Sequence, residues 1–334
     1  MATLGDIEAA AGRLSGVVRQ TPLLRSDAID ALARRRVLVK AECLQHTGSF
    51  KFRGAWSALS AMTPEVRSRG VVAYSSGNHA QGTARAASMF GVPAVIVMPH
   101  DAPKAKVDGT RRYGAEILFY DRARQSREAL GEALMAERGL TLVRPYDDAM
   151  VIAGQGSTGL EIAAQAKQAG SDAAEVLVCC GGGGLTAGVA LALAGHAPRM
   201  RVRPVEPEGF DDVVRSLISG RRERNASPSG SICDAVVTES PGELTFPILK
   251  AHCGPGLVVS DAEALRAVAL AARHLKIVLE PGGAIALAAS LFRQDAITGE
   301  SVIVVASGGN VDSALLAEAL TAFDEAQSGG FSSR

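Results

Sequence analysis

The stretch EVLVCCGGGGLTAGVALAL (175–193) decides the fold of this chain. Its first part, EVLVCC, is a short apolar run of the kind that forms a buried strand, and its last part is Ala-rich with helical spacing. Four consecutive glycines, 181–184, separate the two. The segment therefore predicts a strand, a tight loop and a helix, which together form half of a βαβ unit.

The same alternation extends on both sides of this stretch. We expect strands at 37–42, 70–75, 94–99, 116–120, 140–143, 175–180, 201–206 and 301–307. We expect helices at 78–90, 122–138, 155–169, 185–195, 261–275 and 312–325. Alternation at this pace implies an α/β fold whose sheets are mostly parallel and have both faces covered by helices.

Length and composition narrow the class of protein. The 334 residues suggest about two domains, each able to bury a core. Lys plus Arg and Asp plus Glu are 35 each, so the net charge is +0 and no global charge favours nucleic acid or an anionic membrane. The 36 glycines are more than usual, which is typical of tight turns and of backbone packed against a ligand.

The cysteines and the N-terminus indicate where the protein works. The N-terminal stretch carries Asp6 and Glu8 where a signal peptide needs apolar residues, and charge or glycine interrupts every apolar run before twenty residues. We therefore expect a cytoplasmic protein without a membrane span. Five cysteines, an odd number without zinc spacing, fit a reduced chain: Cys43, Cys179, Cys180, Cys233 and Cys253.

Ligands of open α/β sheets bind beyond the carboxyl ends of the strands, so the loops there carry the chemistry. In TGSFKFRGA (47–55), Lys51 falls at a helix start beside Arg53. Positive potential there lowers the pKa of the amine and favours the neutral form that attacks a carbonyl. The alternative is a solvated surface lysine, which the flanking Phe50 and Phe52 disfavour.

The loop SSGNHAQG (75–82) follows a predicted strand and enters an Ala-rich helix. The hydroxyls of Ser75 and Ser76, the amide of Asn78 and the backbone N–H groups at the helix start form an anion site suited to a carboxylate. A plain helix cap would explain one of these residues but not the cluster. His79 taken alone is more typical of a structural role.

The glycine loop CCGGGGLTAG (179–188) predicts a phosphate site, because bare backbone amides close on the anion and the helix dipole adds favourable potential. It also satisfies G-x-G-x-x-A at Gly182, Gly184 and Ala187, with Glu206 about twenty residues later, which is the dinucleotide fingerprint. An NAD-dependent oxidoreductase is therefore an open alternative on this motif.

A fourth loop, VVASGGN (304–310), places the Ser307 hydroxyl at the sheet edge, although such a sequence is often only a turn. Lysine, phosphate loop, carboxylate site and hydroxyl are together the parts that hold pyridoxal phosphate and an amino acid. Nicotinamide chemistry needs neither Lys51 nor the SSGNH segment.

With these motifs in this order, residues 15–320 resemble the serine/threonine dehydratase family, the fold-type II pyridoxal-phosphate enzymes that include threonine dehydratases, serine racemases and hydroxyaspartate ammonia-lyases. The resemblance implies two open, twisted, mostly parallel sheets flanked by helices, and a homodimer. We expect a large cofactor-binding domain at 1–65 and 148–325 with an inserted small substrate-side domain at 66–147. The tail, 326–334, is expected to be disordered.

The resemblance also implies a role for each matching position. Lys51 would be the Schiff-base lysine and the base at Cα, next to Phe50 in the cofactor site. Asn78 would bond the ring hydroxyl of the cofactor. The remaining cofactor residues would be Gly181, Gly182, Gly183, Gly184 and Leu185 at the phosphate, Ser307 at the pyridine nitrogen, and Glu280 in EPGGA. The substrate carboxylate would meet Ser75, Ser76, Gly77 and His79.

A serine at the pyridine nitrogen has a mechanistic consequence. A neutral hydroxyl leaves the ring largely unprotonated, so the ring is a weaker electron sink. Elimination of a β-hydroxyl suits such a ring, because the electrons from Cα leave with the hydroxyl. We therefore expect a pyridoxal-phosphate-dependent ammonia-lyase that converts a β-hydroxy amino acid (L-threonine, L-serine or 3-hydroxyaspartate) to a 2-oxo acid and ammonia.

Three positions have open alternatives. Ser76 resembles the serine racemases, whereas many threonine dehydratases carry Ala there, so it is either a second catalytic base, which would allow amino-acid racemase activity, or another carboxylate ligand. VEPEGFDD (205–212) resembles a site for Mg²⁺ or Ca²⁺ made by Glu206, the Phe210 carbonyl and Asp212, or is a solvated acidic helix start. Arg127 either binds a second substrate carboxylate, as on 3-hydroxyaspartate, or is an exposed helix residue.

Overall fold

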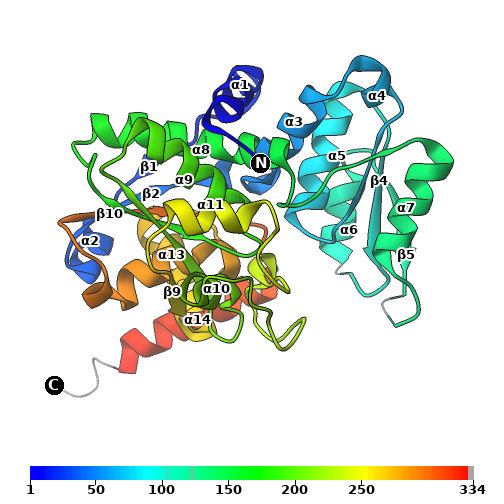
Figure 1. Cartoon of the computed structure of the whole chain (residues 1–334). Coiled ribbons are helices and arrows are strands. Elements are labelled where there is room, and N and C mark those ends of the chain that lie inside the picture. Colours follow the sequence, from blue (N-terminus) through cyan, green and yellow to red (C-terminus); the bar gives the residue numbers. More distant parts are fainter. Residues whose placement is uncertain (103, 122, 330–334) are drawn as a thin grey trace.

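The computed structural model describes residues 1–102, 104–121 and 123–329, and the chain forms two lobes that are each built on one sheet (Figure 1). Within these residues the larger sheet has six strands in the order β1-β2-β10-β7-β8-β9. Every neighbouring pair is parallel except β1 and β2, which confirms the expectation of mostly parallel strands. The strands are β1 (Leu23–Leu24), β2 (Arg36–Lys40), β7 (Glu175–Cys179), β8 (Arg201–Pro207), β9 (Leu257–Val259) and β10 (Ser301–Val305).

Helices bury both faces of this sheet. On one face, Leu38, Val176 and Ile303 pack against two long helices, α8 and α9. On the other face, Val37, Leu177 and Val302 pack against a group of four helices. Such two-sided burial explains why the strands read as continuous apolar runs. The helices are α8 (Ala149–Gln168), α9 (Gly184–His196), α2 (Asp27–Ala33), α12 (Asp261–Leu270), α13 (Pro281–Phe292) and α14 (Ser313–Gly329).

The second lobe holds an entirely parallel sheet of four strands, in the order β5-β4-β3-β6 among the described residues. Helix α7 packs on one face through Leu134, and α3 and α5 pack on the other through Phe52 and Ala84. The elements are β3 (Val71–Tyr74), β4 (Ala94–Pro99), β5 (Glu116–Tyr120), β6 (Thr141–Leu142), α3 (Lys51–Ala61), α5 (Asn78–Phe90), α6 (Lys104–Arg111) and α7 (Arg127–Arg138).

Helix α3 is the wall that the two lobes share. Its buried Phe52 and Leu59 belong to the same apolar cluster as Ile96 of the four-stranded sheet. Gly54, on another side of the helix, packs so closely on Val151 of α8 that an added Cβ would lie 2.9 Å from that side chain. The strands of the small sheet fall within the expected range 66–147, and the domain limits themselves stay a prediction.

The ends of the chain complete the two lobes. Helix α14 extends to Gly329, so residues 326–329 of the expected disordered tail are helical, and 330–334 lie outside the described residues. The remaining helices are α1 (Leu4–Leu14), α4 (Pro64–Ser68), α10 (Asp212–Ser219) and α11 (Thr245–His252).

The structure also bears on the cysteines and on membrane spans. The five cysteines are free thiols. No helix in the described part of the chain is long and apolar enough to cross a membrane.

Candidate active site

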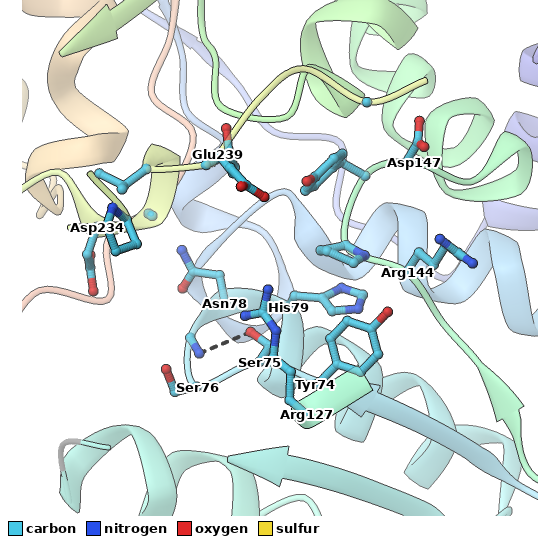
Figure 2. Close-up of a pocket in the computed structure, with 18 of the residues that line it drawn as sticks. Tyr74, Ser75, Ser76, Asn78, His79, Arg127, Arg144, Asp147, Asp234 and Glu239 are labelled. Atoms are coloured by element: carbon cyan, nitrogen blue, oxygen red, sulfur yellow. Dashed lines mark hydrogen bonds between the residues drawn. The ribbon is translucent and has the colours of Figure 1, made fainter. Parts of the chain in front are cut away.

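A cavity of about 1180 Å³ lies where the carboxyl ends of both sheets face each other (Figure 2). Chain segments that follow β3, β6 and β10 line it, together with the start of α3 and residues 222–243. The structure brings into this cavity the following residues that the sequence had singled out: Lys51, Ser75, Ser76, Gly77, Asn78, His79, Arg127 and Glu280.

Lys51 is the first residue of α3, and its Nζ donates a hydrogen bond to the Pro145 carbonyl at 2.9 Å. Removal from water lowers the pKa of this amine to about 8, and the nearby Glu280 carboxylate opposes the shift. The predicted cause, positive potential from Arg53, is wrong, because that guanidinium points away and pairs with Glu42 and Glu161. Burial, rather than a neighbouring cation, thus brings the amine toward its neutral form.

Two side chains, the buried Glu280 and the half-buried Asn310, hold Asn78, the first residue of α5. Asn78 Nδ2 donates to Glu280 Oε1 at 2.5 Å, and Asn310 Nδ2 donates to Asn78 Oδ1 at 2.7 Å. Burial raises the pKa of Glu280 to about 7. A carboxamide held in this way has a fixed orientation toward the cavity that it lines.

The loop before α5 presents small polar groups to the cavity. The backbone N–H of Gly77 donates to Ser75 Oγ at 3.2 Å, the dashed line in Figure 2, and Ser76 lies next to it. His79 is buried, and its Nε2 lies 2.8 Å from the Val143 carbonyl. Burial, and then the nearby Lys51, lower the pKa of His79 to about 3. The imidazole is therefore neutral and adds no positive charge for a carboxylate.

The glycine loop Gly181–Gly184 does not line the cavity itself. The ring of Tyr146, which does line the cavity, packs against this loop. A Cβ at Gly182 would collide with that ring, and Gly183 has φ 91°, a left-handed conformation that glycine adopts without strain. Within the described residues, the N–H groups of Gly181, Gly182 and Gly183 donate to no protein acceptor. Free amides at the start of α9 fit a phosphate group, so the residues present fit pyridoxal phosphate.

The other expected cofactor residues surround this region without lining the cavity. The Phe50 ring centroid lies 5.1 Å from Lys51 Nζ, and the Phe50 N–H donates to the Ser307 carbonyl at 3.1 Å. Ser307 is buried, and an added Cβ on its neighbour Gly308 would meet Glu280 and Asn78. Leu185 is buried in the first turn of α9.

Arg127 reaches the cavity over an aromatic side chain. Its guanidinium lies 5.5 Å from the ring centroid of Tyr74, and Nε donates to Glu128 at 2.7 Å. Figure 2 shows Arg127 next to Tyr74, with His79, Ser76 and Asn78 around the same cavity. Half of the side chain is exposed, so the guanidinium remains open to a ligand.

Several lining residues escaped the sequence analysis. Tyr146 and Pro145 lie in the segment RPYDDAM, which has no motif that marks a ligand site. Asn310 ends the SGGN segment, where the terminal amide was a usable signal beside Ser307. Tyr74 occupies the last position of β3, and only its partner Arg127, far along the chain, gives it a role.

The acidic residues at the end of β8 and at the start of α10 lie outside the cavity lining. Glu206 is buried and accepts from the N–H groups of Val213 and Val214 at 3.1 and 2.7 Å. Its carboxylate thus faces the start of α10 and not the cavity, so its role in the dinucleotide fingerprint is wrong. Asp212 Oδ1 accepts from Asn225 at 2.6 Å, while Oδ2 is buried without a partner.

Two features are typical of the fold-type II pyridoxal-phosphate enzymes. The carboxyl ends of the parallel strands face one cavity, and a lysine in that cavity can form a covalent bond with a carbonyl group. The pyridoxal-phosphate dependent enzyme family matches residues 14–308, and the chain belongs to it. It is an enzyme of the pyridoxal-phosphate-dependent ammonia-lyase class, which acts by β-elimination. The family match therefore excludes the alternative of an NAD-dependent oxidoreductase, which rested on the glycine motif at 182–187.

Named relatives support this class over nearly the whole chain. The chain is 42% identical to an L-threo-3-hydroxyaspartate ammonia-lyase from Pseudomonas sp, over 92% of this chain and 95% of that one. It is 37% identical to a serine racemase from Schizosaccharomyces pombe, over 93% and 94%. Among solved structures, a threonine deaminase from T.th. matches with a TM-score of 0.87 and 44% identity, over 93% and 99% of the two chains.

Proposed function

We propose that this ammonia-lyase acts on 3-hydroxyaspartate. Arg127 carries the proposal: its guanidinium is held over Tyr74 at the cavity, and the Ser75–Gly77 loop lines the same cavity. A guanidinium there forms a charge-assisted pair with the side-chain carboxylate that 3-hydroxyaspartate has and serine or threonine lacks. The similarity to the Pseudomonas enzyme named for this substrate supports the same reading.

The side chains divide the work of elimination. Pyridoxal phosphate, when bound, stabilises the negative charge that develops at Cα. Asn78 and the free amides of Gly181–Gly183 hold the ring and phosphate, and Ser307 meets the ring nitrogen. Lys51 would bond the cofactor and, once the substrate amine has displaced it, its neutral Nζ would take the Cα proton. The Cα electrons would form the Cα–Cβ double bond, and the β-hydroxyl would leave as water with the proton that Nζ took from Cα. Addition of water to the released enamine gives ammonia and a 2-oxo acid.

Carboxylate recognition divides between two sites. The α-carboxylate meets Ser75, Ser76 and the Gly77 amide at the start of α5, where the helix dipole favours an anion. His79, neutral and with its ring N–H donated to the Val143 carbonyl, shapes this loop but adds neither a positive charge nor a donor for the carboxylate. Arg127 then holds the second carboxylate and so orients the β-hydroxyl.

Comparison of two substrates tests the proposal. R127M should lower kcat/KM for L-threo-3-hydroxyaspartate by about 10- to 100-fold, the worth of a hydrogen bond to a charged group, and leave L-serine within about threefold. R124M is the matched control, because Arg124 is exposed on the same segment and pairs only weakly with Asp121 at 3.6 Å. An equal loss on both substrates would make Arg127 structural and overturn the assignment of 3-hydroxyaspartate.

Racemisation is a second candidate activity, since the Ser76 hydroxyl lines the cavity (Figure 2). A hydroxyl on the face opposite Lys51 exchanges a proton at Cα. S76A should then abolish interconversion of L- and D-isomers, measured by chiral chromatography, while elimination from the L-substrate continues. Unchanged interconversion in S76A would leave Ser76 as a carboxylate ligand.

We also propose a site for Mg²⁺ or Ca²⁺ at Glu206, Asp212 and the Phe210 carbonyl. Burial raises the pKa of Glu206, and of Asp212 to about 6, although Arg215 opposes the shift at Asp212, so the two carboxylates are only partly balanced by positive charge. The unpartnered Asp212 Oδ2 supplies an open donor. In the described part of the chain no three His, Cys, Asp or Glu side chains gather for a metal, so carbonyl and water oxygens would complete the shell.

Thermal unfolding tests the cation site. Mg²⁺ should raise the Tm of the wild type and of D211N, the neighbouring control, but not of D212N. The effect should grow from about pH 5.5 to about pH 8, because a cation binds the deprotonated carboxylates. A Tm shift that survives D212N would place the cation elsewhere.

A cytoplasmic homodimer completes the proposal. Free thiols suit a reducing compartment, which supports the location. Light scattering after size exclusion should give twice the 34.5 kDa of one chain. A mass of one chain would contradict the dimer.

A further inference from the structure

Three hydrogen-bonded side chains that line the cavity, those of Asn310, Asn78 and Glu280, form a continuous line. It runs from the Thr47 carbonyl to Asn310 Nδ2 at 2.8 Å, from Asn310 Nδ2 to Asn78 Oδ1 at 2.7 Å, and from Asn78 Nδ2 to Glu280 Oε1 at 2.5 Å. Asn78 and Glu280 are 9% and 5% exposed. Asn78 belongs to the small lobe, whereas Asn310 and Glu280 belong to the large one, so the line joins the two lobes.

Counting hydrogens fixes the direction of every bond in this line. The two hydrogens of Asn310 Nδ2 go to Thr47 and to Asn78, so Asn310 is only a donor toward Asn78. Asn78 must therefore turn its oxygen to Asn310 and its nitrogen to Glu280. One Nδ2 hydrogen of Asn78 is used by Glu280, and the second remains for a ligand in the cavity.

The backbone holds both ends of the line in place. Thr47 has φ 62°, a left-handed conformation uncommon for threonine, and an added Cβ on Gly48 would lie 2.6 Å from Asn310 Oδ1. The Glu280 N–H donates to the Gly308 carbonyl at 3.1 Å. The segments 47–48, 280 and 308–310 thus pack closely against one another around the line of hydrogen bonds.

We propose that Glu280 and Asn310 are positioning residues that fix the carboxamide of Asn78 as a hydrogen-bond donor to the ring oxygen of the cofactor. The proposal rests on the role of Asn78 in the proposed function. An Asn78 amide turned the other way would present its oxygen to the ring oxygen, and two acceptors repel each other. Neither positioning residue has to touch the cofactor.

Glu280 can act in either protonation state, because both a carboxylate and a carboxylic acid retain an acceptor oxygen for Asn78. The charges that act on it are Lys51 at the start of α3, Lys106 on α6 and Asp234 in the loop before α11. Its acceptor oxygen, and not its charge, is therefore the required feature. Glutamine keeps that feature and leucine removes it.

The test compares cofactor affinity and the visible absorbance of the bound cofactor in matched variants of the holoenzyme. N78A removes the contact with the ring oxygen and so gives the loss of cofactor affinity and the change of absorbance expected when that contact is absent. E280L and N310D should each weaken pyridoxal-phosphate binding about tenfold, the worth of one buried hydrogen bond, and shift the visible band as N78A does. The carboxylate that N310D introduces has the shape of the carboxamide but cannot donate to Asn78 Oδ1. E280Q should keep the wild-type band and affinity.

A double variant distinguishes a positioning role of Glu280 from a general loss of structure. Because all variants act through one contact, N78A/E280L should bind the cofactor no more weakly than N78A alone, whereas independent effects would add. Wild-type bands and affinities in E280L and N310D, beside a weakened N78A, would overturn the positioning role and leave the function of Asn78 intact. An unchanged N78A would overturn both. N310D and E280Q preserve size, so the comparison does not depend on the folding of E280L.

Discussion

Arg53 lies two residues after Lys51 and forms buried ion pairs next to the candidate active site, although it does not line the cavity. Its guanidinium donates to both oxygens of Glu42 at 2.8 and 2.9 Å and to both of Glu161 at 2.7 and 3.0 Å. Arg53 and Glu42 are fully buried. Although burial opposes ionisation of Glu42, Arg53 keeps the pKa of that carboxyl below its ordinary value. The pair therefore stays ionised inside the protein.

Removal of this guanidinium should be costly. R53M leaves the buried Glu42 carboxylate with only the Thr21 hydroxyl and the attraction of Lys40, so we expect it to lower the free energy of unfolding by about 3–5 kcal/mol, measured by urea denaturation. R25M is the control, since the Arg25 side chain of the Arg25–Asp30 pair is half exposed and its loss should cost far less than that of Arg53. R53K should not restore stability, because an ammonium cannot make two bidentate pairs. Similar costs for R53M and R25M would contradict the role of burial.

The lowered pKa of Lys51 predicts how the protein takes up its cofactor. Only the neutral amine attacks an aldehyde, so the rate of pyridoxal-phosphate uptake by apoenzyme should rise with pH with a midpoint near pH 8. Stopped-flow absorbance in the visible range measures this rate, with Nα-acetyl-lysine as the reference for the chemistry of the free aldehyde. A midpoint near the ordinary lysine value of about 10.4 would show that burial does not tune this amine.

At the scale of elements, α8 and α9 touch through their backbones. An added Cβ on Gly188 would lie 2.5 Å from the Ile152 carbonyl and 2.6 Å from the Gly156 nitrogen. Since α9 begins at the glycine loop, this contact also sets where the free amides point. Glycine is the one residue that permits such an approach.

Alanine at this contact should force the helices apart. We expect G188A to lower the free energy of unfolding by about 2 kcal/mol or more, in the range of overpacked cores, and to weaken cofactor binding. G12A is the control: nothing lies within 4 Å of its added Cβ in α1, so the better helix propensity of alanine should add up to about 1 kcal/mol. Destabilisation of equal size in both variants would mean that helix contact is not the cause.

Elements with a strong periodic pattern could be predicted to the residue, and weaker ones could not. The bounds of β4 and α5 match the sequence-based expectation. Strands β1 and β9 hold two and three residues, too few for any period to be visible. Helix α13 begins with Pro-Gly-Gly, which reads as a turn, although proline is tolerated at the first helical position.

The site divides in the same way. The motifs around Lys51, Ser75–His79 and Gly181–Gly184 follow predicted strands or open predicted helices, so local sequence was enough to find them. The Asn310–Asn78 bond joins residues 232 positions apart, and the cover of Tyr146 over Gly182 depends on how β7 and the start of α8 approach each other. Only tertiary packing creates these contacts, and no local period encodes them.

At the scale of the molecule, the shared wall α3 should make both lobes unfold together. The single tryptophan, Trp56 in α3, stacks on Phe90 of α5 with ring centroids 4.2 Å apart and donates to the Arg13 carbonyl of α1 at 3.0 Å. Its fluorescence therefore reports on both lobes. Urea transitions followed by Trp56 fluorescence and by far-UV circular dichroism should coincide. Two separated midpoints would show lobes that unfold independently.

The position of β10 in the larger sheet has a consequence for synthesis on the ribosome. Strand β10 lies between β2 and β7, so β2 has no parallel partner until residues 301–305 emerge. The four strands of the small sheet all lie within residues 71–142, and they can pair while translation continues. The nascent chain thus holds a folded small lobe and exposed β2 and β7 edges for most of its elongation, which is the period when chaperones have the most to protect.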